Sequence, residues 1–363
     1  MFWLGLIVSL CYVPGVTGAY IATQWPVLSI LLPLVLWRRG PFTWLHALGL
    51  AFILYAAAHL VSVPIFFDGV WGVWLLCIMG LSFWLGSTSG DLRGLYRGLA
   101  VGASISSVIG WFRYFGFPMV LQVSDNPAGL YVNSVVQGMV LALLIVALVS
   151  ERMWLWVPML VPGLLVSGSR GAWLALAVGL LSVYVRRAWV FGLLGAAGLA
   201  FLLHVKPMSS DELRVLVWYN ALNFLTPWGW GPGSFFSWLM PFRDTLITPE
   251  YGHNDAIQLI FEYGFAALAP LTIFGFVLSR TGAREWPVFV TFITLGCYSM
   301  PLWTPVVSFL ACVVAGRIVG CWALDGIDRA DSRFHGVPWW YGGSTDASHA
   351  AVPVVAGNQT GGN

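Results

Sequence analysis

Three short segments of the sequence carry side chains that could bind and act on an anionic group. One is a tight turn that ends at Arg170, and another combines Arg214 with the glycine-rich run 229–233. The third is His253–Asp255. A guanidinium group can hold a phosphate group through two parallel hydrogen bonds, and an imidazole can take or hold a proton near neutral pH. These residue types suggest a site for a phosphate-containing substrate with a base beside it.

The segment around Arg214 has the features of a short helix in a loop. Ser209 and Glu212 have the spacing of a capping box, which predicts that a helix begins there. One face of this helix carries, at helical spacing, Arg214, Trp218 and Ala221. Gly231 and Gly233 follow, and glycine allows a backbone to approach a ligand closely. The simpler alternative is a loop helix that carries an incidental arginine.

The third segment precedes a long apolar run. His253 is expected at or near the N-terminus of a helix, where N–H groups and the helix dipole favour anions. Glu262 lies about 13 Å deeper along that helix at 1.5 Å per residue, and an ionisable group at membrane depth is a candidate for function. Simpler alternatives remain open for each residue. His253 could be a polar cap, Glu262 could bond another helix, and Arg170 could reach lipid headgroups.

These segments need a membrane-embedded scaffold to position them. Hydrophobic residues make up 59% of the chain and charged residues 9%, and the mean hydropathy is +0.82. Because soluble domains average about 25% charged residues and about 20 apolar residues span a bilayer, we expect an all-α polytopic membrane helix bundle over residues 1–322. It would have about 12 spans, near 2–20, 23–37, 43–63, 70–86, 99–120, 134–150, 154–168, 171–185, 188–205, 256–279, 286–300 and 302–322.

Some of these spans could be assigned differently. The count falls to 11 or 10 if the runs around Pro33 or Pro162 are re-entrant. The first apolar run is expected to be a retained helix rather than a signal peptide, because no basic residue precedes Arg38.

The arginines predict the orientation of the bundle. Most of them, including Arg93, Arg152 and Arg317, fall in alternate connections or in the C-terminal tail. The positive-inside rule makes those connections cytoplasmic. One long extracytoplasmic loop with short helices is then expected at about 206–255. Residues 323–363 form an expected cytoplasmic, largely disordered tail.

Other classes of site have little support in the sequence. The net charge of +2 is too small to indicate a nucleic-acid partner. The five cysteines lie in apolar stretches without metal or redox spacing, so we expect no metal site and no cofactor. His46 and His59 lie in one expected span, but haem ligation would require matching histidines on a partner helix. Polar packing is the simpler interpretation of both residues.

In these same segments the chain resembles the O-antigen ligase and O-antigen polymerase family of bacterial membrane glycosyltransferases. The first matching part is the turn Ser169-Arg170-Gly171-Ala172-Trp173. The second is the spaced set Arg214, Trp218, Ala221, Pro227, Gly229, Gly231, Gly233 and Phe235. The third, which is the most specific, is His253-Asn254 with Ile257, Ile260, Glu262 and Gly264. The motifs cover about residues 165–265, and Asp255 departs from a position that is often apolar in the family.

The resemblance implies a metal-independent, inverting transfer of a glycan from an undecaprenyl-diphosphate carrier to an acceptor hydroxyl. The site would face the periplasm at the outer leaflet of the bacterial inner membrane, in contact with membrane lipid. Arg170 and Arg214 would hold the diphosphate, and His253 would orient or deprotonate the acceptor. Substrate binding is expected to involve Ser169, Trp218, Gly231, Gly233, Asn254 and Glu262.

The resemblance leaves the acceptor open. A ligase would use lipid A–core, a polymerase would use a second carrier-linked glycan, and a protein O-glycosyltransferase would use a side chain. A transporter or flippase for a lipid-linked anion is the alternative from another class. Such a protein would need ionisable residues near the midplane and repeat symmetry, and few such residues and no evident repeat occur in the sequence.

Overall fold

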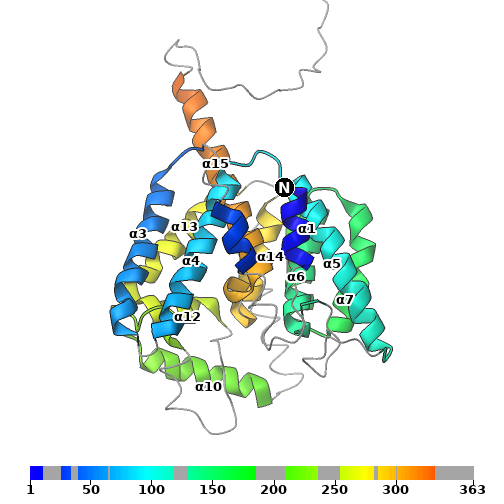
Figure 1. The fold of residues 1–363 in the computed structure, drawn as a ribbon, viewed down its shortest axis with the longest axis horizontal. Helices are drawn as coiled ribbons and strands as arrows, with labels where there is room; N and C mark the ends of the chain where they lie inside the picture. The colour runs from blue at the N-terminus through cyan, green and yellow to red at the C-terminus, as the bar shows by residue number, and fades with distance from the viewer. Residues whose placement is uncertain are drawn as a thin grey trace, which may run out of the picture. The chain divides into compact units, whose positions relative to one another are not determined.

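The protein is an assembly of helices (Figure 1). The computed structural model describes residues 1–10, 26–33, 40–63, 66–117, 130–131, 133–184, 209–235, 254–281, 285–299 and 301–331. No strand occurs within these ranges. The chain divides into two units, Met1–Asp325 and Gly326–Asn363. The tail beyond Asp331, and with it most of the predicted disordered segment, lies outside the described residues.

The described helices follow the predicted apolar runs. In chain order they are α1 (Phe2–Leu10), α3 (Trp44–Ala58) with η2 (His59–Ser62), α4 (Phe66–Ser87), α5 (Arg93–Tyr114), α6 (Ser134–Ser150), η3 (Trp154–Trp156), α7 (Val157–Ser167), α8 (Arg170–Tyr184), α10 (Ser209–Asn223), α12 (Asp255–Tyr263), η5 (Gly264–Ala267), α13 (Leu268–Arg280), α14 (Trp286–Tyr298), η6 (Pro301–Trp303) and α15 (Pro305–Asp331).

Four helical stretches are long and apolar enough to cross a membrane. They are Trp44–Ser62, Phe67–Ser87, Asp255–Arg280 and Pro305–Leu324. Shorter apolar helices cover 134–150, 154–167, 170–184 and 286–297. The expected all-α fold and its membrane character are confirmed to this extent. The count of about 12 spans stays a prediction, because the run 188–205 and much of the first two runs lie outside the described residues.

The outer surface of the helices is apolar, as a bilayer requires. Val61, Leu155 and Phe67 expose 95%, 91% and 82% of their surface. Gathered into a large patch, apolar side chains exposed to this degree would be unfavourable in water. In a lipid environment it is the expected surface, because helices satisfy their backbone polar groups internally and can face hydrocarbon.

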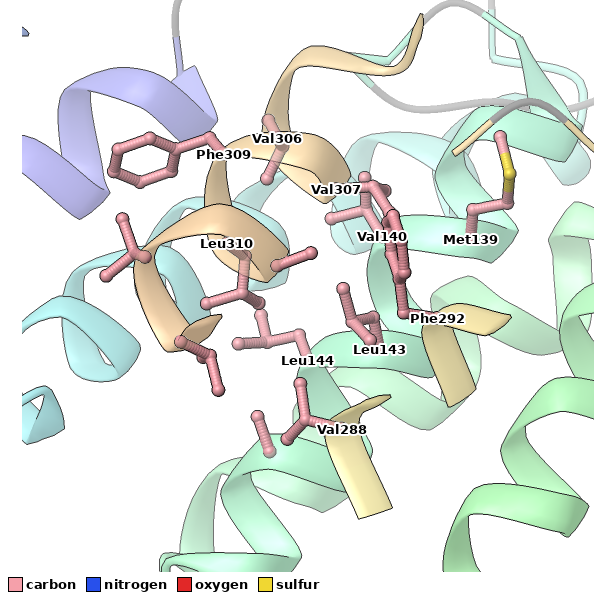
Figure 2. Close-up of a cluster of buried hydrophobic side chains, with 14 of the residues drawn as sticks. Met139, Val140, Leu143, Leu144, Val288, Phe292, Val306, Val307, Phe309 and Leu310 are labelled. Carbon is pink, nitrogen blue, oxygen red and sulfur yellow. The ribbon is translucent and has the colours of Figure 1, made fainter. Parts of the chain in front are cut away.

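The core forms around α6, which is buried along almost its whole length. Its side chains meet those of α14 and α15 in the cluster of Figure 2, which includes Met139, Val140, Leu143, Leu144, Val288, Phe292, Val306, Val307 and Leu310. α5, α7 and α8 also pack against α6. The buried apolar side chains of this central helix therefore form the middle of the hydrophobic core.

Glycines allow two of the helix pairs to approach closely. A β-carbon at Gly86 of α4 would lie 2.7 Å from the Val313 carbonyl carbon of α15, and one at Gly320 would lie 2.9 Å from the Ser87 carbonyl carbon. A β-carbon at Gly98 of α5 would lie 2.7 Å from the Leu6 nitrogen of α1. Small residues at such crossings are typical of helix packing in membranes.

The structure bears on two of the predicted spans, one with a proline inside it and one that is interrupted. Pro162 lies inside α7, and the helix continues through it to Ser167, so the described residues show no re-entrant turn there. The expected single helix 256–279 is instead interrupted. Gly264 has a φ of +53° and begins the 3₁₀ turn η5 between α12 and α13. A left-handed residue cannot continue an α-helix, and glycine adopts that conformation at the least cost.

One end of the bundle carries a cluster of ion pairs. Arg317 Nη1 of α15 lies 3.5 Å from Glu151 Oε1 and 3.9 Å from Glu285 Oε1. Arg93 Nε, at the start of α5, lies 3.6 Å from Glu151 Oε2. These residues belong to connections or helix ends that the sequence assigns to the cytoplasmic side. Their contact shows that these connections share one end of the bundle.

Candidate functional site

The loop helix α10 packs against α12 through a small apolar cluster of its own. Ala221, Phe235 and Phe261 are buried in it, and the Phe235 and Phe261 rings lie 5.2 Å apart, edge to face. The partly buried side chains around them are Val217, Trp230 and Ile257. α10 begins at Ser209, as the capping-box spacing predicts. The segment that bears Arg214 is thus held to the helix that follows His253.

The glycine-rich turn 229–233 links these two helices through its backbone. The φ angles of Gly229, Gly231 and Gly233 are +73°, +91° and +69°. The Trp230 and Gly231 nitrogens donate to the Phe261 and Glu262 carbonyls at 3.1 and 2.8 Å. Three left-handed residues in five turn the chain sharply, and this brings its N–H groups onto the last turn of α12.

A third backbone bond extends this pairing on the other side of the turn. The Phe265 nitrogen in η5 donates to the Pro227 carbonyl at 2.8 Å. Gly264 fits beside Pro227 and Gly229, because a β-carbon there would lie 2.5 Å from the Gly229 nitrogen. The helix therefore breaks at Gly264 because the glycine-rich turn packs there at a distance that leaves no room for a side chain.

The Glu262 carboxylate completes the junction. Its Oε2 accepts a hydrogen bond from the Gly233 nitrogen at 3.2 Å, and its Oε1 accepts one from Gln258 Nε2 at 3.0 Å. The residue is fully buried. A buried carboxylate needs such partners, since an unpaired one carries a large desolvation cost. The simpler alternative stated for Glu262 was a bond to another helix, whereas its partners are the glycine-rich turn and a residue of its own helix. Glu262 therefore holds the turn in place.

The glycine-rich turn also packs against the connection between α3 and α4. A β-carbon at Gly231 would lie 2.6 Å from Val63 Cγ2, and one at Gly72 of α4 would lie 2.9 Å from Pro232 Cβ. Tyr55 of α3 donates its hydroxyl to the Trp228 carbonyl at 2.6 Å. The turn is therefore fixed from two directions, by α12 and by the ends of α3 and α4.

The start of α12 is fixed by the two residues that follow His253. Asn254 is the N-cap, and its Oδ1 accepts from the Ile257 nitrogen at 3.1 Å. Asp255 is buried, and its Oδ2 accepts from the Leu302 nitrogen of η6 at 3.0 Å. Its Oδ1 has no hydrogen-bond partner among the residues that the structure describes. His253 itself lies outside the described residues.

The Ser169–Arg170 turn is built on α6 and α8. Gly168 has a φ of +60° and ends α7. Ser169 is buried and its Oγ accepts from the Ala172 nitrogen at 3.4 Å, at the start of α8. A β-carbon at Gly138 of α6 would lie 2.6 Å from Ser169 Cβ. Arg170 follows as the first residue of α8 and is exposed.

The structure joins some of the predicted site residues directly. Gly231, Gly233 and Glu262 form one hydrogen-bonded unit, and Asn254 lies at the other end of the same short helix. Trp218 is half-buried on α10. The backbone of Arg214 is part of α10, whereas its side chain lies outside the described residues. The roles assigned to Arg170, Arg214 and His253 stay predictions.

Sequence reasoning missed two residues of this junction. Gln258 bonds Glu262, and its spacing of four residues is the spacing at which helix side chains meet, so this pair could have been found. Phe261 meets Phe235 through a tertiary contact and its carbonyl accepts from Trp230. No local pattern signals a contact of that kind.

Metal and haem binding find no support among the described residues. No group of three or more His, Cys, Asp or Glu side chains there is arranged to hold a metal ion. His46 is buried, its Nδ1 accepts from the Thr43 nitrogen at 3.1 Å, and its Nε2 lies 3.2 Å from Ser87 Oγ. Both ring nitrogens are engaged within the protein, which is the polar packing expected for this residue.

Comparison of the chain with models of known protein families and with curated proteins found no match.

Proposed function

We propose that the protein is a membrane glycosyltransferase that moves a glycan from an undecaprenyl-diphosphate carrier to an acceptor hydroxyl, with lipid A–core as the acceptor. The observation that carries the proposal is the junction of α10, the glycine-rich turn and α12. It holds the helix of Arg214 and the start of the helix after His253 in one unit. A cation and a base need such a rigid frame to act on one substrate.

The chemistry assigned to these residues is a single displacement at the anomeric carbon. The acceptor oxygen forms the new bond to that carbon while the carbon–oxygen bond to the diphosphate breaks, with inversion. The electron pair leaves with the diphosphate, and Arg170 and Arg214 stabilise the charge that develops there. His253 takes the acceptor proton or orients the hydroxyl. No metal ion is required for this sequence of bond changes.

The location proposed for this reaction is the periplasmic side of the bacterial inner membrane. The ion-pair cluster of Arg317, Glu151 and Glu285 gathers connections rich in arginine at one end, and the positive-inside rule makes that end cytoplasmic. Along α15, Arg317 lies about 18 Å from Pro305 at 1.5 Å per residue. Pro305 lies two residues after the end of η6, the turn bonded by Asp255 at the start of α12. The proposed site therefore lies toward the other end.

A transfer assay in EDTA tests the proposal. The purified full chain is incubated with undecaprenyl-diphosphate glycan and lipid A–core, and wild type is compared with His253→Ala and Arg214→Ala. Arg93→Ala is the matched control, because Arg93 lies at the ion-pair end and is half-exposed. Glycan transfer by wild type and the control, with loss in both site variants, is the expected result.

Other products of the same assay decide between the alternatives. Longer carrier-linked chains without modified lipid A–core would make the protein a polymerase, and transfer to a protein would make it a protein O-glycosyltransferase. No transfer to any acceptor, or equal transfer by the His253 and Arg214 variants, would contradict the proposed enzyme. Movement of the carrier-linked glycan across vesicles that survives His253→Ala would then favour a transporter.

A further inference from the structure

An exposed apolar patch runs from α10 onto the helix that follows α12. Its members, which we call the loop patch, are Tyr219, Leu222, Leu225, Trp228, Phe265 and Leu268. Trp228 exposes 69% of its surface, Phe265 68% and Tyr219 63%. On α10 the patch lies opposite the side buried in the cluster of Ala221 and Phe261. A solvated loop does not ordinarily present so many large apolar side chains.

The loop patch is continuous with the surface of two candidate membrane spans. The carbonyl of Trp228 accepts a hydrogen bond from Tyr55, which lies in the span Trp44–Ser62. Phe265 and Leu268 lie within the span Asp255–Arg280. The backbone of Phe265 is bonded to Pro227, next to Trp228. The patch is therefore tied to the ends of helices whose outer surface faces lipid.

The direction of α10 fits a position at the membrane surface. Figure 1 shows α10 lying across one end of the bundle, whereas α3, α4 and α15 run along it. A helix that lies in the interface places large apolar and aromatic side chains at the boundary of headgroups and acyl chains. Trp and Tyr are the residues that concentrate at this depth.

We propose that the loop patch is a lipid-binding surface, which seats α10 and the glycine-rich turn in the headgroup and acyl boundary of the bilayer. The occupant is the membrane itself, because the patch adjoins two candidate membrane spans: Tyr55 of α3 bonds the Trp228 carbonyl, and the exposed Leu268 begins α13. This contact with lipid fixes the depth in the bilayer of the turn that holds α10 to α12. The helix that bears Arg214 then lies at the level of lipid phosphate groups.

Depth-dependent fluorescence quenching tests this surface on the full chain. Leu222→Cys and Trp228→Cys are made in a background in which the five native cysteines are replaced by alanine, and each is labelled with an environment-sensitive nitrobenzoxadiazole dye. Gly90→Cys is the water control, because a β-carbon there meets nothing within 4 Å and the residue is exposed. Leu54→Cys, near the middle of the candidate span Trp44–Ser62 and 61% exposed, is the lipid control.

The proteins are placed in phosphatidylcholine–phosphatidylglycerol vesicles with or without bromine on acyl carbons 6 and 7. We expect the dyes at Leu222 and Trp228 to be quenched by brominated lipid at least twofold more than the dye at Gly90, and to be shielded from aqueous iodide. Signals equal to those at Gly90 would overturn the proposal. Shielding from iodide without quenching by bromine would also overturn it, since protein would then cover the patch. No glycan is present, so failure here is distinct from failure of the proposed transfer.

Discussion

The Gly233 backbone nitrogen lies 3.2 Å from the Glu262 carboxylate, although the two residues are 29 positions apart in the chain. This bond joins the glycine-rich turn to a helix within the candidate span Asp255–Arg280. Gln258 donates to the other carboxylate oxygen, so both oxygens of Glu262 are used within the protein. The geometry of the proposed site therefore depends on a side chain that serves as an internal anchor.

Replacing Glu262 with alanine is expected to loosen this anchor. The change removes the carboxylate that accepts from the part-buried Gly233 nitrogen and from the buried Gln258 Nε2. Each unsatisfied donor costs about 1–3 kcal/mol. We expect a lower thermal midpoint in detergent and a fall in glycan transfer, with the fall in kcat larger than any rise in KM.

Glu262→Gln is the matched variant for that experiment. Glutamine keeps one acceptor oxygen and the same length, so it should retain a larger share of both stability and transfer than alanine does. If Glu262→Ala binds the donor more weakly at unchanged kcat and unchanged thermal midpoint, the carboxylate contacts substrate and the anchor interpretation is wrong.

The glycine-rich turn should not tolerate a side chain at Gly233. Its φ of +69° disfavours other residues, and a β-carbon would lie 2.7 Å from the Asp68 carbonyl carbon. The left-handed conformation alone costs about 1–2 kcal/mol for an L-residue, and the clash adds to it. Thermal unfolding of Gly233→Ala is expected to begin at a lower temperature than that of wild type.

Two other glycines separate the cost of the positive φ from the cost of the steric clash. Gly116 has a φ of +81° with open space around it, and Gly90 has open space without a positive φ. We expect Gly90→Ala to be neutral, Gly116→Ala to show the cost of the conformation alone, and Gly233→Ala to exceed both. If Gly233→Ala and Gly116→Ala destabilise the protein equally, the turn relieves its clash with Asp68 at no cost in stability.

The ion-pair end of the bundle gives a prediction about stability. The Glu151 side chain is 5% exposed and lies near both Arg317 and Arg93. Removing one partner of a buried pair costs up to about 3–5 kcal/mol when the remaining charge is left uncompensated, and less here because Glu285 stays 3.9 Å from Arg317. We expect Glu151→Gln to lower the thermal midpoint measured by size-exclusion chromatography after heating.

Arg93 provides the comparison for Glu151. Its side chain is 50% exposed, and exposed pairs contribute about 0–1 kcal/mol. Arg93→Gln should therefore shift the midpoint much less than Glu151→Gln does. Equal shifts would show that solvent screens the whole cluster and that Glu151 is not effectively buried.

Arg170 offers a test of the phosphate role within the proposed enzyme. Loss of one preorganised charge on a developing anion costs roughly a hundredfold to a thousandfold in rate, so Arg170→Ala should reduce kcat by that order. Arg170→Lys should recover only part of it, because lysine lacks the bidentate geometry. Arg113→Ala is the control, since Arg113 lies in the last turn of α5 and outside the matching motifs. Normal kcat for Arg170→Ala would remove this residue from the site.

The sequence predicted most of the described helices because apolar runs mark the stretches that lie in lipid. The helix over 134–150 and the start of α10 at Ser209 agree with the structure. The predicted span 99–120 is displaced, since α5 begins at Arg93 and ends at Tyr114. Helices extend beyond the bilayer as polar turns, and hydropathy does not register those turns.

The junction of the site was less accessible to sequence reasoning. The glycines of the turn and Glu262 were identified by type and by resemblance, but not their contact. The bonds from Trp230 and Gly231 to the end of α12 are backbone bonds, and no side-chain type encodes them. The break at Gly264 follows from this pairing, and for that reason an apolar run predicted a single uninterrupted helix there.

The helix α15 is held at two points, one at the turn before its first residue and one at Arg317 near its middle. Asp255 holds the turn that precedes it, and Glu151 and Glu285 hold Arg317. A segment pinned in this way cannot slide along its axis or rotate about it without releasing one attachment. This part of α15 is therefore fixed in position, and the start of α12 is bonded to the turn that precedes it. One residue inserted between Pro305 and Arg317 would rotate Arg317 by about 100° about the helix axis. The bond from Asp255 and the ion pairs of Arg317 could then not form together.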